Sequence, residues 1–243
     1  MHNMASVPSI RASAPVSSPL QRESLTERSA RAIREAILDG TYKLGQKLTE
    51  AELVSRFGVS SSVIREAFHV LQGEGIVVAK PYCGRSVFSV KPEEGAELTV
   101  MRASLESYAA YLAARKLTPE WADAIVAAAH RFIASPPGNY SAWVDRELGF
   151  HRTVWEAGQN EWLVRQLSQF SMPIFALRIR QRDFDVAALW ENSQLREVDD
   201  NPEGHQLLAS AIVSGDGPLA RKTMIAHILL RSDETGKELF QFE

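Results

Sequence analysis

The sequence predicts a mainly α-helical protein with a small β-containing part near its N-terminus. Three observations support this fold class: two short helical segments that meet at a sharp turn, a β-hairpin pattern directly after them, and apolar residues at helical spacing almost throughout the rest of the chain. With 243 residues, 45% of them hydrophobic, the chain is long enough for two globular domains. We expect a disordered Ser/Ala/Pro-rich arm over 1–22, a first domain over 23–90, a linker over 91–95 and a helical domain over 96–243.

The two short helices carry clear start and stop signals. Thr49 can cap the first one, and Glu52 completes a capping box three residues later. Gly58 ends this helix, since a left-handed residue closes a helix well. Ser60 is a suitable cap for the second helix, which we expect to stop at Gly73.

A hairpin pattern follows the second helix. Residues 76–78 and 87–90 are two β-prone runs, and residues 81–85 between them have turn chemistry with Arg85 at the tip. Two helices at a sharp turn and a hairpin form a winged helix-turn-helix, although the helix pair alone also occurs by chance in helical proteins. In this motif the second helix meets base edges and phosphates with its N-terminal turn, and Arg65 is the residue expected to read a guanine. The candidate DNA-binding residues are Thr49, Arg56, Ser60, Ser61, Ser62, Arg65 and Arg85.

This segment resembles the DNA-binding half of the GntR family of bacterial transcription regulators, over about seventy residues. Residues 30–40 resemble the first helix of the family. The other matching stretches are 42–50, Val59-Ser60, 64–67, Leu71 and 74–76. One departure matters, because the family usually has Arg-Thr-Pro where this chain has Ser61-Ser62-Val63. Losing one cation predicts a shallower salt dependence of DNA binding or a different operator.

Charge and cysteine usage agree with a DNA-binding protein inside the cell. Residues 1–90 carry 11 Lys/Arg against 8 Asp/Glu, whereas residues 91–243 carry 16 against 22, so the basic end is the proposed DNA end. The single cysteine, Cys83, excludes an intramolecular disulfide and suits a reducing compartment. No apolar run is long enough to span a bilayer, and we expect a cytoplasmic protein with no membrane partner.

The second half has apolar residues at helical spacing throughout. Breaks occur at Thr118-Pro119 and over 135–138. Apolar residues from Leu98 to Leu112 and from Trp121 to Phe132 fall at helical spacing, and we expect later helices over roughly 140–157, 160–182, 185–197, 202–214 and 218–240.

Four residues of the helical half form a candidate metal site. Glu147 and His151 are four apart and therefore share one helix face. His205 and His227 lie at similar separations before and after the short loop 215–218, which places them at one height on an antiparallel helix pair. Three imidazoles and one carboxylate suit Zn²⁺, with Ni²⁺ or Mn²⁺ as alternatives, although a single helical histidine is usually only a partnered or surface residue.

The helical half resembles the FCD domain, which accompanies this DNA-binding half in the FadR-type branch of the family. The matching motifs are 100–106, Phe150-His151, 158–160, Leu163, Gly204-His205 and His227. The family normally has Asp where Glu147 stands, which leaves the metal identity open. The resemblance implies that a small organic acid binds beside the metal, and Arg102 and Arg178 are the candidate residues to clamp its carboxylate.

Two functions compete on these observations. The first is a ligand-responsive transcription regulator, a repressor or an activator, that binds a pseudo-palindromic operator as a homodimer, because doubling a short recognition helix greatly increases discrimination. The alternative is a metal-dependent hydrolase at the Glu/His3 cluster. Four protein ligands leave little room for water and substrate, and no general base is evident, so we expect no enzyme. A plain helical scaffold is a third possibility, which the wing disfavours.

Overall fold

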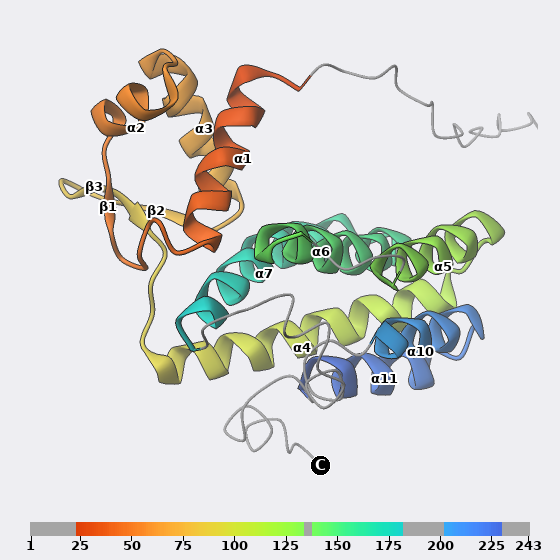
Figure 1. Ribbon diagram of the computed structural model, residues 1–243. Coiled ribbons are helices and arrows are strands. Elements are labelled where there is room, and N and C mark those ends of the chain that lie inside the picture. Colours follow the sequence, from red (N-terminus) through yellow and green to blue (C-terminus); the bar gives the residue numbers. More distant parts are fainter. Residues whose placement is uncertain (1–22, 134–137, 182–201, 230–243) are drawn as a thin grey trace, which may run out of the picture.

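The computed structural model describes residues 23–133, 138–181 and 202–229, and it confirms the predicted fold class (Figure 1). The predicted arm 1–22, the predicted helix 185–197 and the end of the predicted last helix lie outside these ranges. The first domain contains α1 Leu25–Leu38, β1 Lys47–Leu48, α2 Glu50–Phe57, α3 Ser61–Gly73, β2 Val77–Lys80 and β3 Gly84–Val87. The second contains α4 Pro92–Arg115, α5 Pro119–Ile133, α6 Tyr140–Ala157, α7 Glu161–Gln181, α10 Pro202–Val213 and α11 Gly217–Leu229.

The helix-turn-helix forms where its start and stop signals predict. The Thr49 hydroxyl accepts from the Glu52 amide at 3.2 Å, and Gly58 closes α2 in the left-handed region at φ 65°. The Ser60 hydroxyl accepts from the Val63 amide at the start of α3. On its inner face, α3 buries Ile64, Ala67, Phe68 and Leu71, which pack against α1. The apolar spacing therefore fixes which face of α3 remains outside.

The sheet differs from the prediction in register. Its order is β1-β3-β2, both pairs are antiparallel, and the strand β1 was not predicted. Because the turn closes tightly, with the Cys83 amide bonded to the Lys80 carbonyl, pairing resumes at once at Gly84 opposite Lys80. The second strand therefore begins three residues earlier than expected. Arg85 lies inside β3 rather than at the tip of the wing, which corrects its predicted position.

The expected linker 91–95 is also corrected. Helix α4 begins at Pro92, with Lys91 as the N-cap residue and Pro at a position that favours helix starts. The Lys91 amide is satisfied by the Glu94 carboxylate at 2.7 Å. Four of the five residues expected in a linker therefore belong to the first turn of a helix, and the chain between the domains is short.

In the second domain, the long helix α4 runs along the whole bundle (Figure 1). It packs against α6, α7, α10 and α11, and α5 closes the other side against α6 and α10. Most of the α4 positions that face these neighbours are alanines, which let the helices approach closely: Ala103, Ala109, Ala110, Ala113 and Ala114. Inside this bundle lie the buried polar residues described below.

The two domains share one apolar core. Ile33 and Ile37 of α1 and Phe68 of α3 belong to the same buried cluster as Trp143 of α6 and Phe175 of α7. The domains also approach closely at Gly75, where a Cβ atom would lie 2.3 Å from the Gln169 carbonyl oxygen. We call this contact region between α1–α3 and α6–α7 the seam.

Candidate DNA-binding surface and candidate metal centre

The N-terminal turn of α3 is exposed. Ser60, Ser61, Ser62 and Arg65 all face solvent, and the side chain of Arg65 is 57% exposed. Figure 1 shows α2, which directly precedes this turn, on the side of the first domain that faces away from the helical domain. Nothing in the described ranges covers this surface, so it is free to enter a groove of DNA.

Glu50 at the start of α2 connects two of the predicted DNA-binding arginines. One of its oxygens lies 3.1 Å from Nη1 of Arg85, and the other lies 3.8 Å from Nε of Arg65. Arg85 also stacks on Phe68, with Cζ 4.8 Å from the ring centroid, and is only 25% exposed. Arg85 is therefore held against the domain, whereas the terminal nitrogens of Arg65 point outward without a bond among the described residues.

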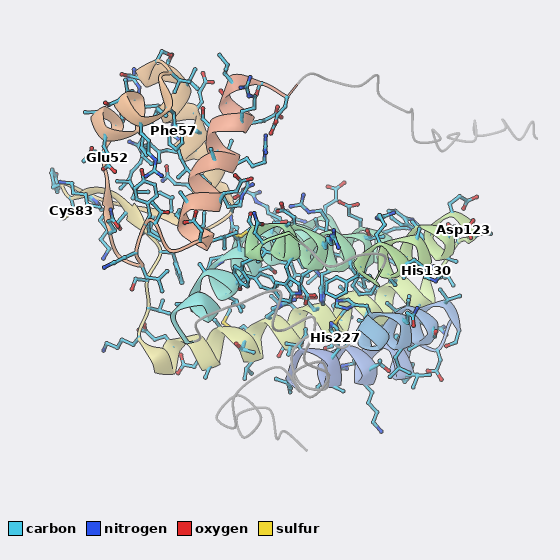
Figure 2. The ribbon with its side chains drawn as sticks, viewed as in Figure 1. Glu52, Phe57, Cys83, Asp123, His130 and His227 are labelled. Carbon is cyan, nitrogen blue, oxygen red and sulfur yellow. The ribbon has the colours of Figure 1, made fainter. Side chains whose placement is uncertain are left out.

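Two other predicted contacts also stabilise the domain itself. Thr49 caps α2, and Arg56, although exposed, donates to the Tyr42 hydroxyl at 3.2 Å and stacks on that ring. The wing exposes groups that sequence reasoning missed. Tyr82 and Cys83 form its tip, as Figure 2 shows for Cys83, and Lys47 and Lys80 are exposed on the adjacent strands. The pairing of β1 with β3, which brings Lys47 to the wing, had no clear signal in the sequence.

The structure brings Glu147, His151, His205 and His227 together in the interior of the second domain. All four are buried, and one possible ligand atom from each lies within 4.8 Å of the others. The Nε2 atoms of His151 and His227 are 3.3 Å apart, Nε2 of His205 is 3.0 Å from Glu147, and Nε2 of His151 is 3.3 Å from Glu147. In Figure 2, His227 lies inside the bundle, whereas His130 lies toward its outer end and is exposed. The equal heights of His205 and His227 follow from the α10–α11 hairpin, as predicted, and their rings are 4.6 Å apart.

Glu106 supports this cluster from α4. It is fully buried and accepts from Nδ1 of His151, from Nε1 of Trp155 at 3.1 Å, and from Arg102. Burial by itself would raise the pKa of Glu106, but Arg102 and His151 more than offset this and hold that pKa at about 2. Burial likewise opposes the charged form of His151, yet Glu106 raises its pKa above the usual value. Sequence reasoning included Glu106 only as part of a motif and gave it no role in the site. Its spacing of four from Arg102 was the available signal.

Arg102 lies in the interior rather than at an open surface. It is 2% exposed, pairs with Glu106, and stacks on Phe175 with Cζ 5.0 Å from the ring centroid. Its Nη2 atom is buried and has no hydrogen-bond partner within the described ranges. Arg178 belongs to α7, and its side chain lies outside the described residues.

An exposed recognition helix with a wing, joined to a helical domain with a buried polar centre, defines a DNA-binding regulator of the winged helix class. The chain belongs to the GntR family: residues 25–87 match the description "Bacterial regulatory proteins, gntR family", and residues 97–230 match the FCD domain. It is therefore a transcription regulator of this family and not an enzyme.

Named relatives extend over most of the chain. The transcriptional repressor GlaR of Escherichia coli is 25% identical, with 82% of this chain and 90% of the relative covered. The Uxu operon regulator of Haemophilus influenzae is 30% identical, with 83% and 78% covered. Among solved structures, E. coli McbR/YncC superimposes with a TM-score of 0.66 at 20% identity over 84% of this chain and 93% of the other, which supports the fold. No helix in the described ranges is long and apolar enough to cross a membrane.

Proposed function

We propose that this protein is a repressor that binds a two-fold symmetric operator as a homodimer in the cytoplasm, and that a small organic acid bound beside a metal ion in the helical domain changes its affinity for DNA. The observation that carries the proposal is that one chain combines the exposed N-terminal turn of α3 with the buried cluster of Glu147 and three histidines. Repression is favoured because two of the relatives, GlaR and the D-xylose utilization operon protein of Paenarthrobacter nicotinovorans, are named repressors.

The four buried residues fit a divalent metal ion. In a tetrahedral site with bonds of about 2.0–2.1 Å, neighbouring ligand atoms are roughly 3.3–3.4 Å apart, and the observed separations of 3.0–3.3 Å are close to this. Because Nδ1 of His151 faces Glu106, its Nε2 atom presents a lone pair to the cluster. We propose Zn²⁺, with Ni²⁺ or Mn²⁺ as alternatives, held by Glu147, His151, His205 and His227. The positive charge of a bound ion would attract an anionic ligand to this centre.

Arg102 supports the choice of a carboxylate as effector. A buried guanidinium nitrogen without an acceptor is costly, by roughly 1–3 kcal/mol, and a ligand carboxylate would satisfy it. The Arg102 side chain is joined to His151 through Glu106, so it lies next to the proposed metal centre. Arg178 remains a proposed second clamp.

Two variants test the proposal on separate sites. An operator is first selected from random duplexes with the wild-type protein. Arg65→Ala should then weaken binding by roughly 1–3 kcal/mol and relax specificity at one base pair, whereas Arg115→Ala, an exposed arginine at the end of α4, should leave it unchanged. His205→Ala should lose stoichiometric metal and the response to carboxylates while keeping basal DNA binding. Unchanged operator affinity in Arg65→Ala, or one metal ion per chain in His205→Ala, would refute the respective assignment.

A further inference from the structure

The seam between the two domains contains a cavity of about 220 Å³. Arg34 of α1 and Glu74 at the C-terminal cap of α3 line one side of it. Asp145, Arg152 and Trp155 of α6 line the other side, together with Ser171 of α7. Figure 1 shows the end of α1 lying beside α6 and α7. The cavity is smaller than the roughly 300–1,000 Å³ of pockets for drug-sized ligands, so it suits a molecule of a few carbon atoms.

The charged groups of the cavity are not all paired with each other. Arg34 and Glu74 form a two-pronged ion pair, with Nε 2.8 Å from one carboxylate oxygen, and so neutralise one another. Asp145 and Arg152, in contrast, are solvent-exposed and form no hydrogen bond or ion pair with any residue of the described ranges, although the positive charge of Arg34 acts on Asp145 across the cavity. One negative and one positive group therefore face the cavity without a direct partner.

The spacing of these two groups indicates what lies between them. Residues 145 and 152 are seven apart on α6, which is two helical turns or roughly 10 Å along one face. Two hydrogen bonds of about 2.9 Å would leave a gap of roughly 4–5 Å. The rise between the two residues is too long for a direct ion pair, and the remaining gap matches an ammonium and a carboxylate that are separated by two or three carbon atoms, as in a β- or γ-amino acid.

A third polar group points to a ligand independently. The Ser171 side chain is 1% exposed, lines the cavity, and has no hydrogen-bond partner for its hydroxyl within the described ranges. A buried hydroxyl without a partner is unfavourable, and a polar ligand atom would satisfy it.

We propose that the seam cavity binds a small zwitterion of the amino-acid class, with its ammonium group on Asp145, its carboxylate on Arg152 and a hydrogen bond to Ser171. This site is separate from the proposed effector site at Arg102. Its walls belong to both domains: Glu74 is the C-cap residue of the recognition helix, and Trp155 donates to the same Glu106 that holds His151. A ligand in this cavity would therefore contact both domains and affect how they pack against each other.

The test is calorimetric titration of the full-length, zinc-loaded protein with each of the twenty common amino acids and with 4-aminobutanoate. Butanoate and butylamine serve as probes that each lack one charge. We expect saturable binding of at least one zwitterion, weakened tenfold or more by both Asp145→Asn and Arg152→Gln, and no comparable binding of the singly charged probes. Glu156→Gln on α6 and Arg165→Gln on α7 are exposed matched controls outside the cavity and should bind as the wild type does.

The outcomes separate this inference from the proposed function. Absence of saturable binding for every probe at millimolar concentration would overturn it, and so would equal binding of butanoate and 4-aminobutanoate. Binding that survives both cavity variants but is lost in Arg102→Lys would place the ligand at the other site and also overturn it. Metal content and operator affinity of the same proteins are measured in parallel, and a failure there would reject the proposed function alone.

Discussion

Glu106 organises the interior of the helical domain at the level of single residues. Its two oxygens accept from three side chains on two helices, and each of these side chains also belongs to a second feature. Arg102 carries the orphaned Nη2, His151 belongs to the metal cluster, and Trp155 lines the seam cavity. Because the Glu106 carboxylate accepts a hydrogen bond from Nδ1 of His151, the other ring nitrogen, Nε2, faces the metal cluster.

Replacing Glu106 tests this supporting role. Glu106→Gln keeps the size of the side chain but removes the charge that holds His151, so we expect zinc affinity to fall by roughly 10–100-fold. Competition titration against a chelating dye measures the affinity. The exposed Glu156→Gln on α6 is the control and should retain the wild-type value. Equal affinities in the two variants would show that Glu106 acts only in packing.

The pKa of Glu106 also predicts how acid affects the metal-free protein. Burial opposes the charged form, but Arg102 and His151 hold the pKa in the folded state at about 2, below the ordinary 4.5. The stabilisation, roughly 3 kcal/mol, is therefore fully present above about pH 4.5 and is lost as the pH falls toward 2. Urea unfolding between these values should show this loss in the wild type, and a smaller one in Glu106→Gln. Identical slopes for the two proteins would contradict the assignment.

At the level of elements, the recognition helix depends on its cap. Ser60 accepts from the Val63 amide and contacts the Ser62 hydroxyl at 2.8 Å. Ser60→Ala should cost about 1 kcal/mol of unfolding free energy, since one free amide loses its acceptor. Ser61→Ala is the control, because the Ser61 hydroxyl is exposed and has no such bond. Denaturant unfolding measures both, and equal losses would mean that the cap contributes nothing.

Local signals explain which elements could be predicted. Thr49, Gly58 and Ser60 act through bonds and backbone angles within a few residues, so the boundaries of α2 and the start of α3 follow from the sequence. The candidate metal cluster could be predicted for a related reason, because a short loop fixes the relative height of His205 and His227 on two neighbouring helices.

Features that depend on distant pairing were missed. The register of the wing depends on a tight turn in which Tyr82 has a φ of 62°. Aromatic residues rarely adopt a positive φ, so the sequence does not predict this turn. Strand β1 pairs only with β3, and the inward position of Arg85 depends on an ion pair with Glu50 of helix α2. Contacts of this kind are set by tertiary packing rather than by local propensity.

At the level of the whole molecule, the seam joins the DNA-binding domain to the helical domain at Gly75. Pro173 has no N–H, so the Gln169 carbonyl lacks its usual helical donor, and Gly75 lies directly against that carbonyl. A side chain at residue 75 would also meet Pro173 at 3.1 Å. Only glycine fits between the two domains at this point.

A pair of glycine variants separates this contact from backbone strain. Gly75 and Gly58 both have positive φ, 75° and 65°, so an alanine at either position costs about 1 kcal/mol in conformation. A Cβ at residue 58 meets nothing within 4 Å, whereas one at residue 75 collides with α7. Gly75→Ala should therefore lower the thermal midpoint clearly more than Gly58→Ala and should expose the seam to hydrogen exchange. Equal shifts and unchanged exchange would show that the domains do not depend on this contact.

The position of Cys83 has a practical consequence. It is the single cysteine of the chain, and it lies exposed at the far end of the wing, between a solvent-facing tyrosine and the start of β3. A maleimide dye would therefore attach at one place only, at the tip of the wing. Fluorescence from that dye would report the arrival of the wing on a duplex in real time, without any engineered substitution.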